Sequence, residues 1–209
     1  MTRPSQKSTW EDAYRKKLPT ERSWTQDIPS ESLHYIDQLS LPSSTPIIDV
    51  GGGSSHLAEQ LLSRNFTDIS VLDISDSALH ESKLRIEQSH PNQKMVQWIT
   101  ADITMWSPPR TYGLWHDRAV FHFLVDTQQQ KQYVQTVESA TQSGAFVIMG
   151  TFALDGPEMC SGLPVQRWSS SSLAAMFADN FSTLESRVQP HITPWGSTQS
   201  FTWLVLQRN

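Results

Sequence analysis

A glycine-rich turn between two acidic strand ends is the strongest chemical pattern in the chain. Residues 47–55 read Ile-Ile-Asp-Val-Gly-Gly-Gly-Ser-Ser, so a short apolar run ends near Asp49 and is followed by glycines. The pattern is typical of a strand, a tight turn and the start of a helix, where bare backbone N–H groups can face a polar or anionic ligand. About twenty residues later, a second apolar run ends in Asp73, whose carboxylate could bind ribose hydroxyls. Together these residues predict a site for a nucleoside-type cofactor.

The spacing of the glycines distinguishes between two kinds of cofactor. A dinucleotide-binding turn needs glycine or alanine at its third marked position, where helix and strand pack closely. Counted from Gly51 and Gly53, that position is His56, which is bulky and polar. Asp49 is not part of the dinucleotide pattern either. A nicotinamide oxidoreductase would also need a hydride-transfer tyrosine or serine, and none is evident, so this class is the weaker alternative.

On these residues the sequence resembles the class I S-adenosylmethionine-dependent methyltransferases. Their first motif is an acid, any residue and Gly-x-Gly-x-Gly or a close variant, which stands here as residues 49–55 with Ser55 in place of the last glycine. The later motifs of the family are matched, in order, by residues 71–75, 99–103 and 112–118. The resemblance covers roughly residues 40–209.

A longer run within the fourth motif region narrows the resemblance. Residues 115–124 read Trp-His-Asp-Arg-Ala-Val-Phe-His-Phe-Leu. Small bacterial methyltransferase-like proteins without an assigned substrate contain the same run. The resemblance therefore implies a methyltransferase but does not name the methyl acceptor.

The resemblance implies S-adenosylmethionine as the cofactor and assigns roles to the motif residues. The expected cofactor-binding residues are Asp49, Gly51, Gly53, Asp73, Ile74, Asp102 and Ile103. Asp49 would help to position the methionine amino end, and Asp73 would accept hydrogen bonds from the ribose hydroxyls. Asp102 would accept from the adenine amino group, with Ile103 packed on the ring. The alternative is structural: glycines needed only for the turn, and acids that favour a helix N-terminus or a turn.

Polar residues at and after the fourth strand are the candidates for the reaction itself. Methyl transfer from a sulfonium is an in-line displacement, so the protein mainly aligns the reactants and adds a base where the nucleophile arrives protonated. The candidate catalytic residues are Asp117 and His116, and the candidate substrate-binding residues are Arg118, His122, Arg167 and His191. Arg118 could bind a substrate carboxylate or an internal acid, and His122 could instead belong to the core. Phe121 and Phe123 are expected in the core, and we expect no metal ion.

Apolar runs and amphipathic segments predict the elements that carry these residues. Strands are expected at 47–50, 69–73, 95–99, 112–117, 145–151, 181–188 and 200–207, and helices at 54–64, 76–88, 128–141 and 172–178. This alternation predicts an α/β protein with a doubly wound, mostly parallel sheet and helices on both faces. The last two strands lack an intervening helix and should pair antiparallel. The resemblance implies the seven-stranded, Rossmann-like methyltransferase fold.

The N-terminal segment is expected to differ from the main domain. Residues 1–40 are predicted as a helical cover segment and residues 41–209 as the S-adenosylmethionine-binding domain. The first eight residues are polar and expected to be disordered. Helices are expected from Thr9 to Leu18 and from Ser30 to Leu39.

Aromatic residues and a long loop are the predicted covers of the site. Trp10, Tyr14 and Trp24 would close over the cofactor, or would form the apolar stripe of a packed helix. Residues 155–168 are predicted as an irregular loop, and loops of that length are often lids or binding loops. Within this loop Cys160 could contact substrate, although a buried packing thiol is the more common role.

Composition limits the class of protein. A chain of 209 residues is long enough for one α/β domain with a substantial core. The net charge is -5 and no basic block is present, which disfavours nucleic acid as a partner. A single cysteine cannot form an internal disulfide, and no apolar run is long enough to span a bilayer, so we expect a cytoplasmic protein.

These observations predict methyl transfer from S-adenosylmethionine to a small polar molecule, with S-adenosylhomocysteine as the product. A protein side chain is the alternative acceptor. A protein that binds the cofactor without turnover is the alternative outside the enzymes. It would keep the first three motifs and could lose the polar cluster of residues 116–122, which is present here.

Overall fold

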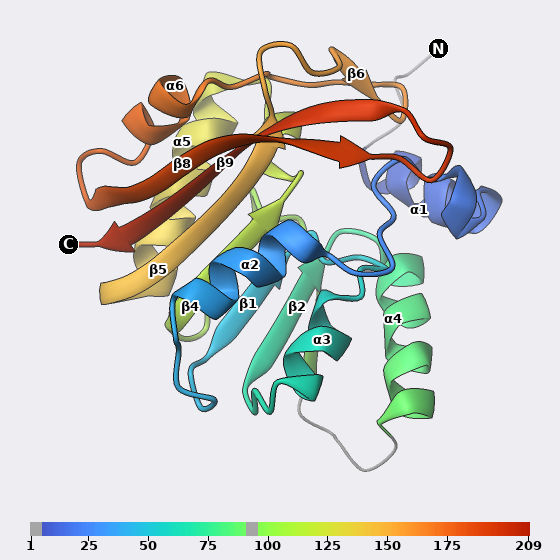
Figure 1. Cartoon of the computed structure of the whole chain (residues 1–209), viewed down its shortest axis with the longest axis horizontal. Coiled ribbons are helices and arrows are strands. Elements are labelled where there is room, and N and C mark those ends of the chain that lie inside the picture. Colours follow the sequence, from blue (N-terminus) through green and yellow to red (C-terminus); the bar gives the residue numbers. More distant parts are fainter. Residues whose placement is uncertain (1–5, 91–95) are drawn as a thin grey trace.

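The computed structural model describes residues 6–90 and 96–209 of the chain (Figure 1). The disorder predicted for the first eight residues lies partly outside these ranges, and residues 6–8 are helical, which corrects that prediction. Residue 95, the predicted start of a strand, also lies outside the described residues.

One seven-stranded sheet forms the centre of the molecule. The strands are β1 (Ile47–Val50), β2 (Ile69–Asp73), β3 (Val96–Thr100), β4 (Tyr112–Arg118), β5 (Thr141–Phe152), β8 (Phe181–Ile192) and β9 (Thr198–Arg208). Their order is β3-β2-β1-β4-β5-β9-β8, with β1 to β5 parallel and β9 antiparallel to both of its neighbours. The predicted doubly wound, mostly parallel sheet with an antiparallel C-terminal strand is confirmed.

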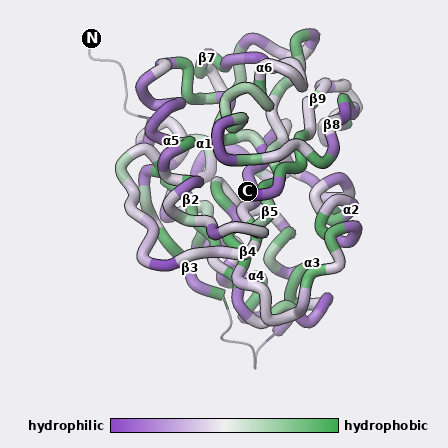
Figure 2. The backbone as a smooth tube through the Cα atoms, turned by 90° about the vertical axis from the view of Figure 1, so that its left-hand side faces the viewer, coloured by the Kyte–Doolittle hydropathy of each residue, from purple (hydrophilic) through white to green (hydrophobic). Residues whose placement is uncertain are grey.

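Helices cover both faces of this sheet. They are α1 (Gln6–Lys16), η1 (Pro19–Glu21), α2 (Ser30–Gln38), α3 (Leu57–Ser63), α4 (Asp76–Ser89), η2 (Phe121–Phe123), α5 (Thr127–Ala140) and α6 (Ser170–Ala175). Apolar residues of α2, α3 and α4 pack against one face, and those of α5 and α6 pack against the other. Hydrophobic and hydrophilic colours alternate along the covering helices in Figure 2, because each helix buries only one side.

The pairing of β1 with β4 determines which side chains meet at the carboxyl ends of the strands. The sheet order reverses between these two strands, at the position where ligands bind in open α/β sheets. In the register of this pair, Asp49 is opposite His116 and Val50 is opposite Asp117. Since successive side chains of a strand point to opposite faces, Asp49 and His116 share one face, and Asp117 lies on the other.

Residues 155–168 contain more structure than the sequence predicted. The strands β6 (Met159–Cys160) and β7 (Leu163–Pro164) pair antiparallel and form a separate hairpin. Ser161 and Gly162, the two residues that connect them, both have positive φ angles, 50° and 77°. A two-residue turn with both φ angles positive matches the twist of a hairpin, and a Ser-Gly pair between apolar residues permits it. The prediction of an irregular loop is wrong for this part.

Candidate active site

A cavity opens at the carboxyl ends of β1, β2 and β4. It offers about 1190 Å³ of space not filled by protein atoms, part of which is open to solvent at its mouth. Six of the seven predicted cofactor residues line it: Asp49, Gly51, Asp73, Ile74, Asp102 and Ile103. Gly53 belongs to the same turn but not to the lining, where Gly52 and Ser54 stand on either side of it.

The glycine turn needs glycine at its first and third positions for steric reasons. Gly51 and Gly53 have φ angles of +68° and +46°, a region that residues with a side chain rarely adopt. A Cβ atom on Gly51 would lie 1.9 Å from Cγ2 of Val120. A Cβ atom on Gly53 would lie 2.5 Å from the hydroxyl oxygen of Tyr14. The turn therefore admits close approach of both the segment after β4 and helix α1.

Asp73, at the end of β2, is a buried acid in the cavity wall. One of its oxygens accepts a hydrogen bond from the backbone N–H of Ser75 at 2.8 Å. Burial raises the pKa of Asp73 to about 7, an effect that the Ser75 N–H opposes and the charge of Asp49 reinforces. A ligand hydroxyl or cation at this wall would stabilise the ionised carboxylate.

Asp102 lies in the loop after β3. Its Oδ1 atom accepts hydrogen bonds from the backbone N–H and the hydroxyl of Thr104, at 2.9 and 2.7 Å. These bonds fix the carboxylate next to Ile103 and Ala101, which also line the cavity. An acid beside apolar side chains forms a slot for a flat ring with a polar edge.

His116 lies between two polar partners in the cavity wall. Its Nδ1 atom is 2.7 Å from Oδ1 of Asp49, and its Nε2 atom is 2.9 Å from the hydroxyl oxygen of Ser32 on α2. The three residues are almost fully buried, with relative exposures of 3% for Asp49, 2% for His116 and 1% for Ser32. All three nevertheless belong to the cavity lining. A carboxylate, an imidazole and a hydroxyl are thus linked in series.

Asp117 lies next to His116 in sequence but not in the cavity lining. Its two carboxylate oxygens accept from the backbone N–H groups of Val120 and Phe121, at 2.8 and 3.1 Å, and from the hydroxyl of Tyr133. Burial raises the pKa of Asp117 to about 6, although these hydrogen bonds oppose the effect. Asp117 holds the turn after β4 in place, and its carboxylate does not face the cavity.

Arg118 ends β4 and contributes a guanidinium to the cavity lining. One of its N–H groups donates to the backbone carbonyl of Trp24 at 2.8 Å. Burial lowers the pKa of Arg118 to about 10, so the group stays charged near neutral pH. Within residues 6–90 and 96–209, no carboxylate lies within ion-pair distance of it.

The other predicted substrate-binding residues do not line this cavity. His122 is buried against Phe152, and its Nδ1 atom accepts from the Phe152 backbone N–H. Burial lowers the pKa of His122 to about 3, so the ring is neutral. Arg167 forms an ion pair with Glu158 at 2.9 Å, and His191 contacts the backbone carbonyl of Ser23.

An aromatic cluster forms part of the cavity wall. Trp10 packs edge-on against Trp24 and Phe123, with ring centroids 5.5 and 5.0 Å apart, and Tyr14 lies 5.9 Å from Trp24. All four rings line the cavity. The expected burial of Phe121 and Phe123 is confirmed, and Phe123 also forms part of the cavity wall. Cys160 of the β6–β7 hairpin also reaches the cavity, and burial raises the pKa of its thiol.

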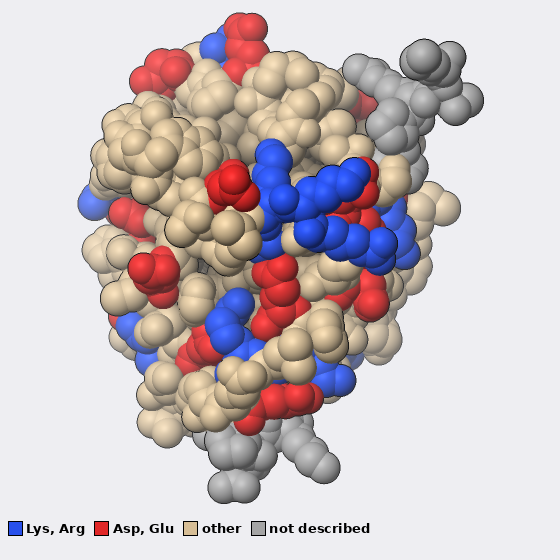
Figure 3. All heavy atoms as spheres, turned by 90° about the vertical axis from the view of Figure 1, so that its right-hand side faces the viewer, with Lys and Arg blue, Asp and Glu red and all other residues tan. Residues whose placement is uncertain are grey.

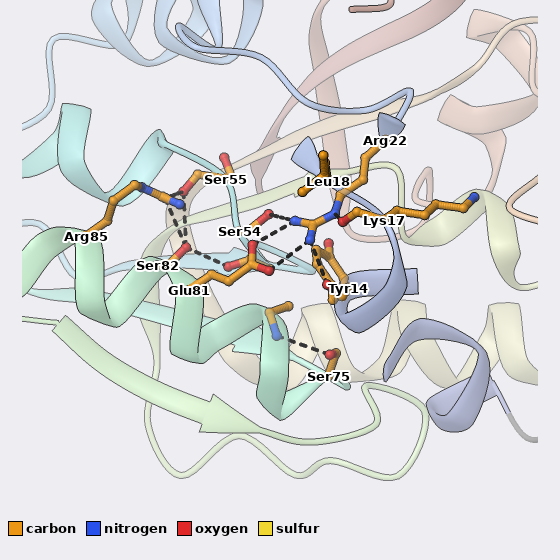
Figure 4. A network of polar contacts seen from close by, with 12 residues as sticks. Tyr14, Lys17, Leu18, Arg22, Ser54, Ser55, Ser75, Glu81, Ser82 and Arg85 are labelled. Atoms are coloured by element: carbon orange, nitrogen blue, oxygen red, sulfur yellow. Dashed lines mark hydrogen bonds and ion pairs between the residues drawn. The ribbon is translucent and has the colours of Figure 1, made fainter. Parts of the chain in front are cut away.

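Arg22 holds the N-terminal segment to the main domain (Figure 4). Its side chain is 2% exposed and forms a bidentate ion pair with Glu81 of α4, at 2.7 and 2.8 Å. The same guanidinium donates to the carbonyls of Tyr14 and Lys17 and to the hydroxyl of Ser54. A single buried cation therefore links α1, η1, the glycine turn and α4.

The outer face of this region carries charges of both signs. Figure 3 shows Lys and Arg side chains gathered beside Asp and Glu side chains over α1 and α4. Two ion pairs lie on α1: exposed Lys16 with exposed Asp12, and exposed Arg15 with the partly buried Glu11. Glu11 also accepts from the backbone N–H of Asp76 and the hydroxyl of Ser77, which attaches α1 to the N-terminus of α4.

The analysis of the sequence missed Ser32 and Arg22. Ser32 looks like an ordinary polar residue of an amphipathic helix, and nothing in its neighbourhood marks a contact 84 residues away. Arg22 lies in a polar stretch without a motif. The residues that contact them lie on other elements, so no local pattern could identify either residue.

Comparison with known proteins agrees with this geometry. Residues 47–144 match the family model described as a methyltransferase domain. No curated protein is significantly similar to the chain in sequence.

Solved structures share the fold at low sequence identity. Magnesium protoporphyrin IX methyltransferase from Synechocystis PCC 6803, with bound SAM, has a TM-score of 0.74 and 13% identity over 100% of both chains. N-methyltransferase NodS from Bradyrhizobium japonicum WM9, in complex with S-adenosylhomocysteine, has a TM-score of 0.68 and 12% identity over 95% of this chain and 97% of its own. A structure on the conversion of a disulfide bond into a thioacetal group in echinomycin biosynthesis has a TM-score of 0.76 and 15% identity, over 98% of this chain and 93% of its own.

These likenesses establish the architecture, and the family model covers the segment from β1 to the start of β5. That segment contains the glycine turn, the acids at the ends of β1 and β2, and the His116 strand. Residues 47–144 therefore match a methyltransferase domain, and the chain as a whole has the class I methyltransferase fold.

Proposed function

We propose that this methyltransferase takes its methyl group from S-adenosylmethionine and transfers it to a small polar acceptor, with S-adenosylhomocysteine as the second product. The residues present fit that cofactor. Asp49, Asp73 and Asp102 line the cavity, and their negative charges would stabilise the positively charged sulfonium and ammonium groups of the cofactor. Asp73 would bind the ribose hydroxyls, and Ile74 and Ile103 would pack on the adenine. When bound, the cofactor supplies a methyl group on a sulfur that leaves readily.

The main evidence for the chemical class of the acceptor is the position of Arg118. A guanidinium that is charged, lines the cavity and has no carboxylate partner among the described residues is a site for an anionic group. Its planar fork matches a carboxylate or phosphate in a bidentate manner. We infer an acceptor that carries such a group and presents its nucleophile toward the cofactor.

His116 is the proposed base, and Asp117 is a proposed positioning residue. His116 belongs to the lining and is oriented by Asp49, whereas both oxygens of Asp117 already accept hydrogen bonds from protein groups. We therefore assign to Asp117 the task of holding the turn that carries Arg118 and Val120. His122, Arg167 and His191 are not retained as substrate contacts in this proposal, because they lie outside the lining.

Residues 1–40 are the proposed cover, and residues 41–209 the proposed cofactor-binding domain. Aromatic residues of the cover line the cavity, and Arg22 ties them to α4. A covered cavity favours a small acceptor over a protein side chain. A membrane-crossing helix does not occur among the described residues. We keep a cytoplasmic location and the absence of nucleic-acid partners as predictions, in line with the net charge of -5.

Calorimetric titration with S-adenosylmethionine, S-adenosylhomocysteine and NAD tests the proposal. We expect binding of the first two and none of NAD. The Asp73→Ala variant should bind S-adenosylmethionine more weakly by about 1–3 kcal/mol, because ribose hydroxyls would lose a buried acceptor. Binding of NAD alone would contradict the cofactor assignment, and full affinity in the variant would contradict the ribose-binding role of Asp73. Release of S-adenosylhomocysteine in the presence of small hydroxy acids and amino acids would then identify acceptors.

A further inference from the structure

Three polar residues from distant parts of the chain form a continuous hydrogen-bonded series beside Arg118. Asp49 ends β1, His116 lies on β4, and Ser32 lies in the first turn of α2. The Asp49–His116 and His116–Ser32 distances are 2.7 and 2.9 Å, and the three residues line the cavity. Burying three polar side chains in a wall is costly unless they are paired, so the arrangement is a defined network rather than packing.

The network has a preferred direction. Ionised Asp49 can only accept a hydrogen bond, so Nδ1 of a neutral His116 must carry the ring proton. The Nε2 atom is then a bare acceptor, and it receives the hydroxyl proton of Ser32. The lone pairs of the Ser32 oxygen remain free to accept a further hydrogen bond. Nε2 is the ring nitrogen of His116 that could act as a base, and the hydroxyl of Ser32 covers it.

We propose that Ser32 is the residue that takes the proton from the methyl acceptor, as the outer end of a Ser32–His116–Asp49 relay. This inference rests on the proposed function. As the acceptor atom gives its proton to Ser32, the hydroxyl proton of Ser32 passes to Nε2 of His116. The electron pair of the acceptor forms the bond to the methyl carbon, and the pair of the broken C–S bond stays on sulfur. Asp49 stabilises the resulting imidazolium, which afterwards loses a proton to water.

The relay defines the chemical class of the acceptor. A thioether carries no proton on its nucleophilic atom and would not need the relay. A hydroxyl loses its proton during the transfer, and an ammonium group must lose one before its nitrogen can attack, so a general base commonly accelerates such steps. With Arg118 as the anion site, the acceptor has an anionic group together with an O–H or N–H nucleophile.

Nuclear magnetic resonance of ¹⁵N-histidine protein, saturated with S-adenosylhomocysteine, tests the relay without an acceptor. We expect His116 to carry its proton on Nδ1, with an Nε2 resonance that moves in Ser32→Ala and is restored in Ser32→Thr, which keeps the hydroxyl. Ser30→Ala is the matched control, because Ser30 lies on the same helix and its hydroxyl donates to the Ile28 carbonyl at 3.3 Å and not to His116. A proton on Nε2 of His116, or an Nε2 resonance unaffected by Ser32→Ala, would overturn the proposal.

Methyl transfer to defined probes tests the chemistry. With 4-hydroxybenzoate and glycine as proton-bearing acceptors, Ser32→Ala should lower kcat about 100-fold or more with little change in KM, and Ser32→Thr should recover much of it. With 3-(methylthio)propionate, whose sulfur carries no proton, the variant should keep its rate. An equal loss of kcat with proton-bearing and proton-free acceptors would overturn the relay. If none of these probes is methylated, the NMR spectrum of His116 decides. Calorimetry distinguishes a failure of the proposed function from a failure of the relay. If the wild-type protein does not bind S-adenosylmethionine, the proposed function is contradicted. If it binds normally but His116 carries its proton on Nε2, only the relay is contradicted.

Discussion

The two sides of the cavity are built in different ways. The strand side consists of the ends of β1 and β2, the glycine turn and the loop after β3, and its residues follow one another in short motifs. The cover side consists of α1, the segment around Trp24 and the hairpin that carries Cys160. Residues of the cover side are attached by contacts with distant elements, among them Arg22 to Glu81 and His191 to Ser23.

The difference teaches where this molecule can move and where it cannot. The strand side is held by the backbone ladder of a central parallel sheet and by a turn that tolerates only glycine at two positions. The cover side is held by a few polar contacts and one aromatic cluster. Segments fixed by few contacts open at lower free-energy cost than core strands, so ligand exchange should proceed through the cover.

The largest effect is expected from removal of the imidazole on the strand side. His116→Gln should lower kcat for a proton-bearing acceptor by about 10²–10⁴-fold, because the base is lost while binding groups remain. Steady-state kinetics on the identified acceptor would measure the change. His34→Gln, an exposed histidine on α2, is the control and should leave kcat unchanged. If the kcat of His116→Gln stays within threefold of wild type, a difference of under about 1 kcal/mol in activation free energy, His116 is not the base.

A stability effect of slightly smaller size is expected from Asp73. Its pKa is raised to about 7 in the folded protein, so between its unfolded value and about pH 7 the native state binds more protons than the unfolded state. Its contribution to stability is therefore complete below about pH 4 and is lost as the pH rises through about 7. Asp73→Asn should stabilise the ligand-free protein at pH 8 by on the order of 2–4 kcal/mol, and hardly at pH 4. Urea unfolding at both pH values measures this, and an equal change at both would show that ionisation is not the cause.

Arg118 connects the two sides, since it ends β4 and donates to the Trp24 carbonyl. Arg118→Met should raise KM for an anionic acceptor about 10–100-fold, equivalent to a charge-assisted hydrogen bond of about 1.5–3 kcal/mol. Arg118→Lys should recover part of the affinity, because it keeps the charge but loses the planar fork. A neutral analogue of the acceptor should be insensitive to either change; equal losses for both acceptors would instead point to displacement of Trp24.

The smallest effect is expected from loosening of the cover. Arg22→Met should accelerate dissociation of S-adenosylhomocysteine about 10-fold, because the ion pair with Glu81 and three further hydrogen bonds are lost. Stopped-flow dissociation and hydrogen exchange of residues 10–24 would detect it. Lys16→Met removes an exposed ion pair on α1 and should change neither quantity. Exchange that accelerates in β1 and β2 to the same extent would show that the cover and the sheet open together.

Much of the strand side could be predicted because its pattern is local. An apolar run followed by Asp49 and Gly51 predicts a strand and a turn whatever the rest of the chain does, and Asp73 follows from the same rule. The cover side was predicted only in outline. Trp10, Tyr14 and Trp24 were recognised as aromatic residues near the site, but the residue that attaches them, Arg22, has no signature in its neighbourhood.

The sequence by itself determined the order of strands and helices, the glycine turn, and the acids at the strand ends, since periodicity and turn chemistry act over a few residues. Tertiary structure alone decided which of the adjacent residues His116 and Asp117 faces the cavity. The register that sets Asp49 opposite His116 makes the choice, and a shift of one residue would exchange the two faces. Packing of α2 on that face then brought Ser32 to His116, because contacts between residues this far apart depend on register and packing rather than on local sequence.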